Sequence, residues 1–286
     1  MRIEIPLGLA AAAALALATP AFAETVEVNG IEMHYEVSGS GDPLVVLHGA
    51  YMNIPSMGEI IPLLAESNTV YALEFQGHGR TADIDRPITY ENLADDVAAF
   101  MDAVSLDSAN VFGYSMGAGA GLQLAIRHPD RVEKLILASG AFDAAGWQPE
   151  FTAMIPQMSR DMFVGTPMEE AYREHAADPD GFPALVDKLI QLEKEPMAWG
   201  EDVAELDLPV LLIAGDSDVA TNEHQVELFR LLGGGAMGDM GVPLPRVRLA
   251  ILPATSHTAV ITQTDLLGIF IDQFLAGETP QGLSFE

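Results

Sequence analysis

The feature that most constrains this chain is a glycine-flanked serine between an apolar segment and a helix-like one. Residues 113–117 spell Gly-Tyr-Ser-Met-Gly, after the apolar run Ala109–Phe112 and before the helix-like run Gly117–His128. A strand that turns sharply into a helix strains the central residue and leaves room only for small residues two positions away. The turn would lift the Ser115 hydroxyl beside the helix N-terminus, where backbone N–H groups favour negative charge, so Ser115 is the candidate nucleophile.

Outside this turn, strand-like and helix-like stretches alternate, which predicts an α/β sheet with covering helices. Val26–Val28 and Ile31–Val37 flank Asn29-Gly30, a strong hairpin signal. Further apolar runs predict strands at Leu44–Leu47, Val70–Phe75, Ala109–Phe112, Leu135–Ala138, Val210–Ala214 and Leu249–Leu252. Helical periodicity predicts helices at Tyr90–Ala103, Gln225–Leu232 and Thr264–Phe274.

The stretch 142–205 breaks this alternation. It contains helical fragments but no convincing strand, and prolines cut it into short pieces. We therefore predict a helical cap inserted into the sheet domain.

A serine needs a base, and His257 is the best placed of the seven histidines. It follows the last predicted strand and precedes the last helix, so its loop can reach the turn at the carboxyl ends of the strands. It also fits the Ser–acid–His chain order known for this kind of turn. The other histidines lie in a hairpin, in helices, in the cap or in turns, where structural roles are expected: His34, His48, His78, His128, His175 and His224.

The base in turn needs a carboxylate that fixes its tautomer and stabilises its charged form. Two candidates, Asp216 and Asp218, close the apolar strand Val210–Ala214. Asp218 is favoured because it lies further into the loop and can turn toward His257, whereas Asp216 is expected to cap or shape the turn. Glu223 is a distant third candidate.

The turn His48-Gly49-Ala50-Tyr51 follows a predicted strand and can supply half of an oxyanion hole. The backbone N–H groups of Ala50 and Met116 would then bind the developing oxyanion, each contributing about 3 kcal/mol. The alternative is an ordinary strand-to-loop turn.

Tyr51, Met52 and Met158 are candidate pocket residues. An apolar set early in the cap either packs the cap onto the core, the favoured interpretation, or lines an acyl pocket: Phe151, Met154, Ile155, Met158 and Met162.

Taken in order, these segments resemble the α/β-hydrolase superfamily over about residues 25–276. The resemblance rests on Val45–Gly49, Gln76–Arg80, the turn around Ser115, Arg127–Val132, the Gly-Asp-x-Asp loop and the late histidine. It is greatest to capped bacterial serine esterases and lipases, and it implies a mostly parallel eight-stranded sheet flanked by helices. The core would span 24–141 and 206–286, with the cap at 142–205. Glu74-Phe75-Gln76 and Ser256 depart from the usual pattern.

The function expected from these residues is hydrolysis of a small to medium apolar carboxylic ester through an acyl-enzyme on Ser115, without cofactor or metal. The serine disfavours epoxide hydrolases and haloalkane dehalogenases of this fold, which attack with aspartate. The same triad could also cleave C–C bonds, amides or N-terminal peptides, or run a cofactor-free perhydrolysis. A non-catalytic ligand-sensing protein is the alternative from another class.

Residues 1–23 predict a cleaved signal peptide, so the protein is expected to be exported, either periplasmic or secreted, and to begin near Glu24. The apolar run Leu7–Ala18 is too short for a membrane span, and Ala21-Phe22-Ala23 suits a cleavage site. The chain has no cysteine, which excludes disulfides, thiolate nucleophiles and zinc–thiolate sites.

The formal net charge of −29 argues against nucleic acid and anionic lipid as partners, because both are negatively charged. A small-molecule ester is the expected partner, and stable membrane insertion is not expected. The acidity suits general solubility or, alternatively, adaptation to high salt.

Overall fold

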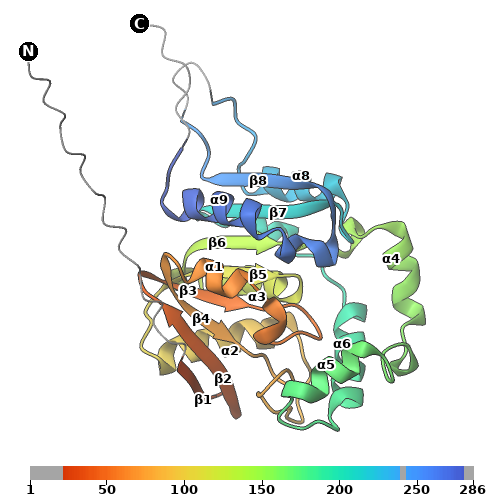
Figure 1. The fold of residues 1–286 in the computed structure, drawn as a ribbon. Coiled ribbons are helices and arrows are strands. Elements are labelled where there is room, and N and C mark those ends of the chain that lie inside the picture. The colour runs from red at the N-terminus through yellow and green to blue at the C-terminus, as the bar shows by residue number, and fades with distance from the viewer. Residues whose placement is uncertain (1–21, 239–242, 280–286) are drawn as a thin grey trace, which may run out of the picture.

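The computed structural model describes residues 22–238 and 243–279, and a single sheet organises them (Figure 1). Eight strands pair in the order β1-β2-β4-β3-β5-β6-β7-β8. The strands are β1 (Phe22–Val28), β2 (Ile31–Gly39), β3 (Asp42–Leu47), β4 (Asn68–Leu73), β5 (Ala109–Tyr114), β6 (Val132–Ala138), β7 (Val210–Ser217) and β8 (Val247–Ser256). The β1–β2 and β2–β4 pairs are antiparallel and the others are parallel. The predicted α/β class with a mostly parallel eight-stranded sheet is confirmed.

The first two strands form the predicted hairpin. Asn29 and Gly30 connect them with φ angles of 49° and 83°. A two-residue turn with both φ angles positive matches the right-handed twist of the flanking strands, and asparagine and glycine tolerate that conformation best. The sequence signal and the observed turn therefore agree.

Helices cover both faces of the sheet, as Figure 1 shows. Along β3, Leu44 and Val46 pack on one face with α1 (Ile60–Leu64) and α9 (Thr264–Leu275). Val45 and Leu47 pack on the other face with α2 (Tyr90–Ala103), α3 (Met116–Arg127) and α8 (Asn222–Leu231). Because neighbouring residues of a strand point to opposite faces, a strand covered on both sides must be apolar throughout. This explains the continuous apolar runs in the sequence.

The strand after α1 ends earlier than predicted. β4 stops at Leu73, and Glu74 is fully buried, where its carboxylate accepts hydrogen bonds from the N–H groups of Ile54, at 3.2 Å, and Arg80. The Gln76 amide donates to Asp83 at 2.8 Å. The unusual Glu74-Phe75-Gln76 segment thus fixes the neighbouring loops through buried hydrogen bonds, and Phe75 belongs to those loops.

Between β6 and β7 the chain forms four α-helices, α4 (Pro149–Met154), α5 (Pro167–His175), α6 (Phe182–Lys194) and α7 (Gly200–Ala204), besides short 3-10 turns. Residues 142–205, all of them described, contain no strand. A proline stands in the first turn of α4, α5 and α6, where its missing N–H is not needed. Helices α4, α5 and α6 lie together at one end of the sheet (Figure 1), and apolar residues of α6 join the core. We refer to 142–205 as the cap.

The predicted signal peptide lies almost wholly outside the described residues. The first described strand begins at Phe22, so Phe22 and Ala23 pair with Val37 and Glu36. No helix among residues 22–238 and 243–279 is long and apolar enough to cross a bilayer.

Candidate active site

Ser115 stands at the turn between β5 and α3. Its backbone is strained, with φ 54° and ψ −117°, and its N–H donates to the Ala138 carbonyl at 2.9 Å. A methyl group on Gly117 would overlap the Leu47 carbonyl, and one on Gly113 would overlap Gly117 itself. Only glycine therefore fits at both flanking positions, and α3 can begin directly behind the serine.

His257 lies beside this hydroxyl. It begins the 3-10 turn His257–Thr262 after β8, and its Nε2 is 2.9 Å from the Ser115 Oγ. The Tyr114 hydroxyl, one residue before the serine, donates to the His257 carbonyl at 3.0 Å. The strand that presents the serine thus also holds the backbone of the histidine.

Asp218 contacts the other nitrogen of the ring. The His257 Nδ1 is 2.6 Å from its Oδ1, which also accepts the Val219 N–H at 2.7 Å. The Ser139 hydroxyl donates to its Oδ2 at 2.6 Å. Burial of this carboxylate would raise its pKa, but the hydrogen bond and charge of His257 and the other donors outweigh burial and lower the pKa. Asp218 therefore stays ionised while fully enclosed.

The other two acid candidates lie elsewhere. Asp216 is exposed and accepts the N–H groups of Ala254, at 2.8 Å, and Thr255, at 3.1 Å. These backbone hydrogen bonds lower the pKa of Asp216 and tie the end of β7 to the end of β8, just before His257. Glu223 is exposed on α8, and no contact between it and His257 occurs among the described residues. Of the three, only Asp218 lies against the histidine.

Replacing Ser139 with alanine is expected to lower kcat about tenfold. The substitution removes one donor from a buried carboxylate, which then holds His257 less firmly and stabilises its charged form less well. Steady-state kinetics of the purified protein, on a substrate that it hydrolyses, measures the effect. The matched control is Ser217→Ala, because Ser217 is exposed and donates to Asp216 at 3.1 Å. An unchanged kcat in folded Ser139→Ala protein would contradict the role of this hydroxyl.

The loop that carries Ala50 is held by two buried imidazoles. The His48 Nδ1 is 2.7 Å from the Gly49 carbonyl, and its Nε2 accepts the Phe75 N–H at 3.1 Å. The His78 Nε2 accepts the Tyr51 N–H at 3.3 Å. Both rings therefore shape the turn, as expected. Ala50 and Met116 line the same cavity as Ser115. Met116 is the first residue of α3, so no carbonyl earlier in the helix can accept its N–H.

Burial lowers the pKa of both histidines, to about 3 for His48 and to about 4 for His78, from 6.5 for an exposed histidine. Both rings are therefore neutral near pH 7. Below pH 6.5 the unfolded chain takes up protons that the folded protein cannot bind. The stability that these neutral rings contribute is complete above that pH. It is lost as the pH falls toward about 4 for His78 and about 3 for His48.

We expect His78→Gln to flatten this pH dependence. Between roughly pH 6 and pH 4.5, the free energy of unfolding should fall less steeply with pH in the variant than in wild-type protein. The two slopes should differ by up to about 1.4 kcal/mol per pH unit, the value for one proton. Urea unfolding at several pH values measures it, with wild-type protein as reference. Identical slopes would mean that His78 is not held neutral by the fold.

A cavity of about 490 Å³ opens beside Ser115 and His257, and it is lined mainly by aromatic and methionine side chains. The structure brings all three predicted pocket residues, Tyr51, Met52 and Met158, to this cavity. Phe151 and Met154 also line it.

The expected packing role of the early cap residues is only partly met. Met154 and Met162 are 38% and 47% exposed, so neither is buried against the core. Met158 packs against the core as well as lining the cavity. The cap is held instead by α6, whose buried side chains include Leu185 and Leu189.

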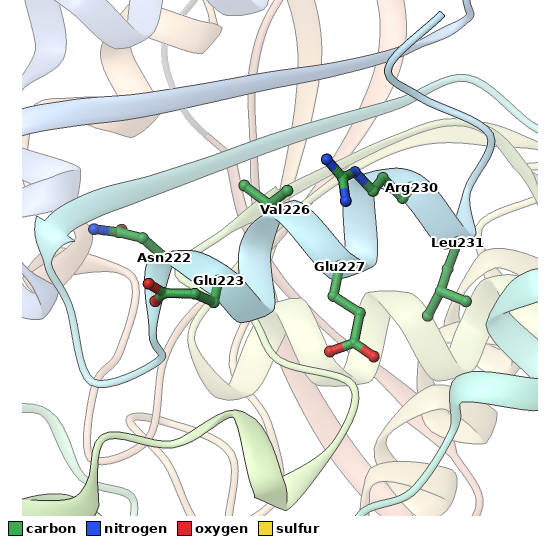
Figure 2. Close-up of a pocket in the computed structure, with 6 residues that line it drawn as sticks. All are labelled: Asn222, Glu223, Val226, Glu227, Arg230 and Leu231. Atoms are coloured by element: carbon green, nitrogen blue, oxygen red, sulfur yellow. The ribbon is translucent and has the colours of Figure 1, made fainter.

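A second cavity, of about 540 Å³, borders α8 (Figure 2). Its described lining residues all belong to that helix: Asn222, Glu223, Val226, Glu227, Arg230 and Leu231. None of them is part of the serine–histidine–aspartate contact, so this second cavity is not the reaction site. No cluster of three or more potential metal ligands occurs in residues 22–238 and 243–279.

Several residues of the site were not anticipated from the sequence. Ser139 reaches Asp218 from the end of β6, while Tyr90, Trp147 and Glu193 line the cavity from α2 and the cap. Flanking glycines and an apolar strand predicted Ser115 from the sequence, but no such neighbouring pattern marks these four residues. They become functional candidates only because the fold brings distant segments together.

The fold and this site define a class of protein. Its sheet is mostly parallel, a serine stands at the sharp turn after the fifth strand, and a histidine near the end of the chain contacts that serine. Sequence comparison agrees, because the family described as alpha/beta hydrolase fold matches residues 42–167. Over residues 42–167 the chain is thus similar to the α/β-hydrolase family.

Individual relatives are similar over part of the chain. A soluble epoxide hydrolase of Corynebacterium sp. (strain C12) is 29% identical over 168 residues, 58% of this chain and 54% of the relative. A 2-hydroxymuconate semialdehyde hydrolase of Pseudomonas sp. (strain CF600) is 30% identical over 150 residues, 48% of this chain and 53% of the relative. The chain thus spans about half the length of these relatives. A solved serine hydrolase involved in carbazole degradation superposes with a TM-score of 0.72 at 21% identity, covering 91% of this chain and 100% of that one.

Proposed function

We propose that this protein is a serine hydrolase that cleaves a small to medium apolar carboxylic ester through an acyl-enzyme on Ser115. The observation that carries the proposal is the continuous contact from the Ser115 Oγ through the His257 ring to the Asp218 carboxylate, at 2.9 Å and 2.6 Å. In this arrangement the imidazole can take the hydroxyl proton while the carboxylate stabilises the charge that it acquires.

In the acylation step, the Ser115 Oγ attacks the acyl carbon and its proton passes to the His257 Nε2. The oxygen of the former carbonyl becomes negative, and we propose that the N–H groups of Ala50 and Met116 bind it. As the tetrahedral intermediate collapses, the alcohol leaves with the proton held by His257. Water then repeats the sequence on the acyl-enzyme and releases the acid.

The apolar cavity beside Ser115 supports an apolar acyl group of modest size. About 490 Å³ accommodates a short to medium chain and lies within the usual range for small-molecule pockets. Its aromatic and methionine lining would bind such a chain by removing apolar surface from water.

A substrate panel tests the proposal. Purified protein should turn over p-nitrophenyl butyrate and octanoate with much higher kcat/KM than the corresponding anilides. Parallel assays should give lower rates for C–C cleavage of a dienoate and for peracid formation. Preferential C–C cleavage, amide cleavage or perhydrolysis would replace ester hydrolysis as the function. Binding of these compounds with no turnover and no labelling by a fluorophosphonate would favour a ligand-sensing role.

We also propose that the protein is exported, because residues 1–23 carry the pattern of a cleaved leader. N-terminal sequencing of protein from the periplasm or medium of a bacterial host should give Glu24 as the first residue. Retention of Met1 in cytoplasmic protein would contradict export.

A further inference from the structure

Among the described residues that line the mainly aromatic and methionine cavity, one has a carboxylate, Glu193. Glu193 lies in the last turn of α6 and lines the cavity together with Ser115 and His257. It is half-buried, and its carboxylate has no hydrogen-bond or ion-pair partner in the part of the chain that the structure describes. No lysine or arginine occurs among the described residues that line this cavity. A ligand group in the cavity therefore meets a carboxylate that no lysine or arginine of the described lining pairs with.

The groups that face Glu193 come from three elements. They are Tyr51 in the loop after β3, Tyr90 at the start of α2, and His257. Burial raises the pKa of both tyrosines, and the nearby Glu193 charge raises them further. Burial also raises the pKa of Glu193, while the charge of His257 opposes that shift. The carboxylate is thus within electrostatic range of the reaction centre and of two aromatic rings.

A carboxylate near two tyrosines, in a cavity that also contains a tryptophan, suits one kind of ligand group. Ammonium and quaternary ammonium ions are attracted both by the negative face of tyrosine and tryptophan rings and by an anionic side chain. Tyr51, Tyr90 and Trp147 supply such rings in the cavity. A carboxylate on the substrate would instead approach a like charge where water is scarce and electrostatic interactions are strong.

We propose that Glu193 is a specificity-determining residue that favours esters with an ammonium group and rejects esters with a carboxylate. This inference rests on the proposed ester hydrolysis at Ser115, and it names the substrate class of that site. Glu193 acts on substrate binding through charge and takes no part in the proton transfers of the triad.

Three butyrate esters of similar size test the proposal: butyrylcholine, 3,3-dimethylbutyl butyrate as its neutral analogue, and 3-(butanoyloxy)propanoate as an anionic analogue. In wild-type protein, kcat/KM should be about tenfold higher for the cationic ester than for the neutral ester. It should be lowest for the anionic ester.

Glu193→Gln keeps the shape of the side chain and removes its charge. The ratio of kcat/KM for the cationic to the neutral ester should fall about tenfold in this variant, chiefly through KM, and the anionic ester should improve relative to the neutral one. The matched control is Glu195→Gln. Glu195 is exposed, lies outside the cavity and contributes equally to the net charge, so its removal should leave the wild-type ratios in place.

The ratio of kcat/KM for each charged ester to kcat/KM for the neutral ester could be the same in wild-type protein and in Glu193→Gln. With the neutral ester still cleaved, that result would overturn the proposal and leave ester hydrolysis intact. An equal fall in Glu195→Gln would also overturn it, because the preference would then come from the overall negative charge. Failure of wild-type protein to cleave any of the three esters would overturn both the proposal and the proposed function.

Discussion

Ser115→Ala is expected to lower kcat for the preferred ester by at least about 10⁴-fold. The substitution removes the atom that forms the acyl-enzyme, and alanine offers no other nucleophile at the turn. The remaining rate would come from the oxyanion donors and the cavity, which can still bind the ester and polarise it toward water. Steady-state turnover of p-nitrophenyl butyrate at saturating concentration measures the loss.

The fold should survive this change, because the strain at position 115 belongs to the turn and the hydroxyl makes no contact outside the triad among the described residues. Thermal unfolding is therefore the companion measurement. Ser256→Ala serves as a control, since Ser256 precedes His257 but is exposed and does not line the cavity. Turnover by Ser115→Ala at more than about a tenth of the wild-type rate would show that another group is the nucleophile.

Asp218→Asn is expected to lower kcat by about 10⁴-fold, the second-largest effect. Asparagine keeps the size of the side chain, but its amide cannot stabilise a charged imidazole, and it favours the wrong tautomer of His257. The loss should be in kcat, with KM little changed, because Asp218 is fully enclosed and does not line the cavity. Comparison of kcat and KM with wild-type protein gives the result.

Asp216→Asn is the matched comparison, because it makes the same chemical change two residues away. Asp216 accepts the Ala254 and Thr255 N–H groups, so its loss should loosen the end of β8 before His257 and lower kcat by less than about tenfold. If Asp216→Asn lost more activity than Asp218→Asn, the assignment of the acid would be reversed.

Much of the sheet could be predicted because its signals are local. The hairpin depends on two adjacent residues that accept positive φ angles, and the buried parallel strands depend on runs that must be apolar on both faces. Helix α2 was predicted with its observed bounds, Tyr90–Ala103, from its apolar periodicity, and in the structure Thr89 caps its start by accepting the Asn92 N–H. The end of β4 was missed, because the strand stops at Leu73 although the next residues are buried, and the Glu74 side chain accepts N–H groups from distant loops.

The site residues likewise fall into those with a local sequence signal and those without one. The turn at Ser115 has a local signature, and position along the chain indicated His257 and Asp218. The structure places His257 against the Ser115 hydroxyl and Asp218 against His257. Ser139 lies 79 residues from its partner Asp218, and Glu193 enters the cavity from the cap, so neither is marked by its neighbours in sequence. In the cap, methionines fit a core and a pocket equally well, and only packing distinguishes the exposed Met162 from Met158 at the cavity.

The central claim is that His257 makes the hydroxyl of Ser115 reactive. Mass spectrometry of protein treated with a fluorophosphonate tests it most directly, on wild-type protein and on His257→Ala. We predict one adduct, on the peptide that contains Ser115, and a labelling rate lower by at least about 10³-fold in the variant. An adduct on a different serine, or equal labelling rates in the two proteins, would contradict the account.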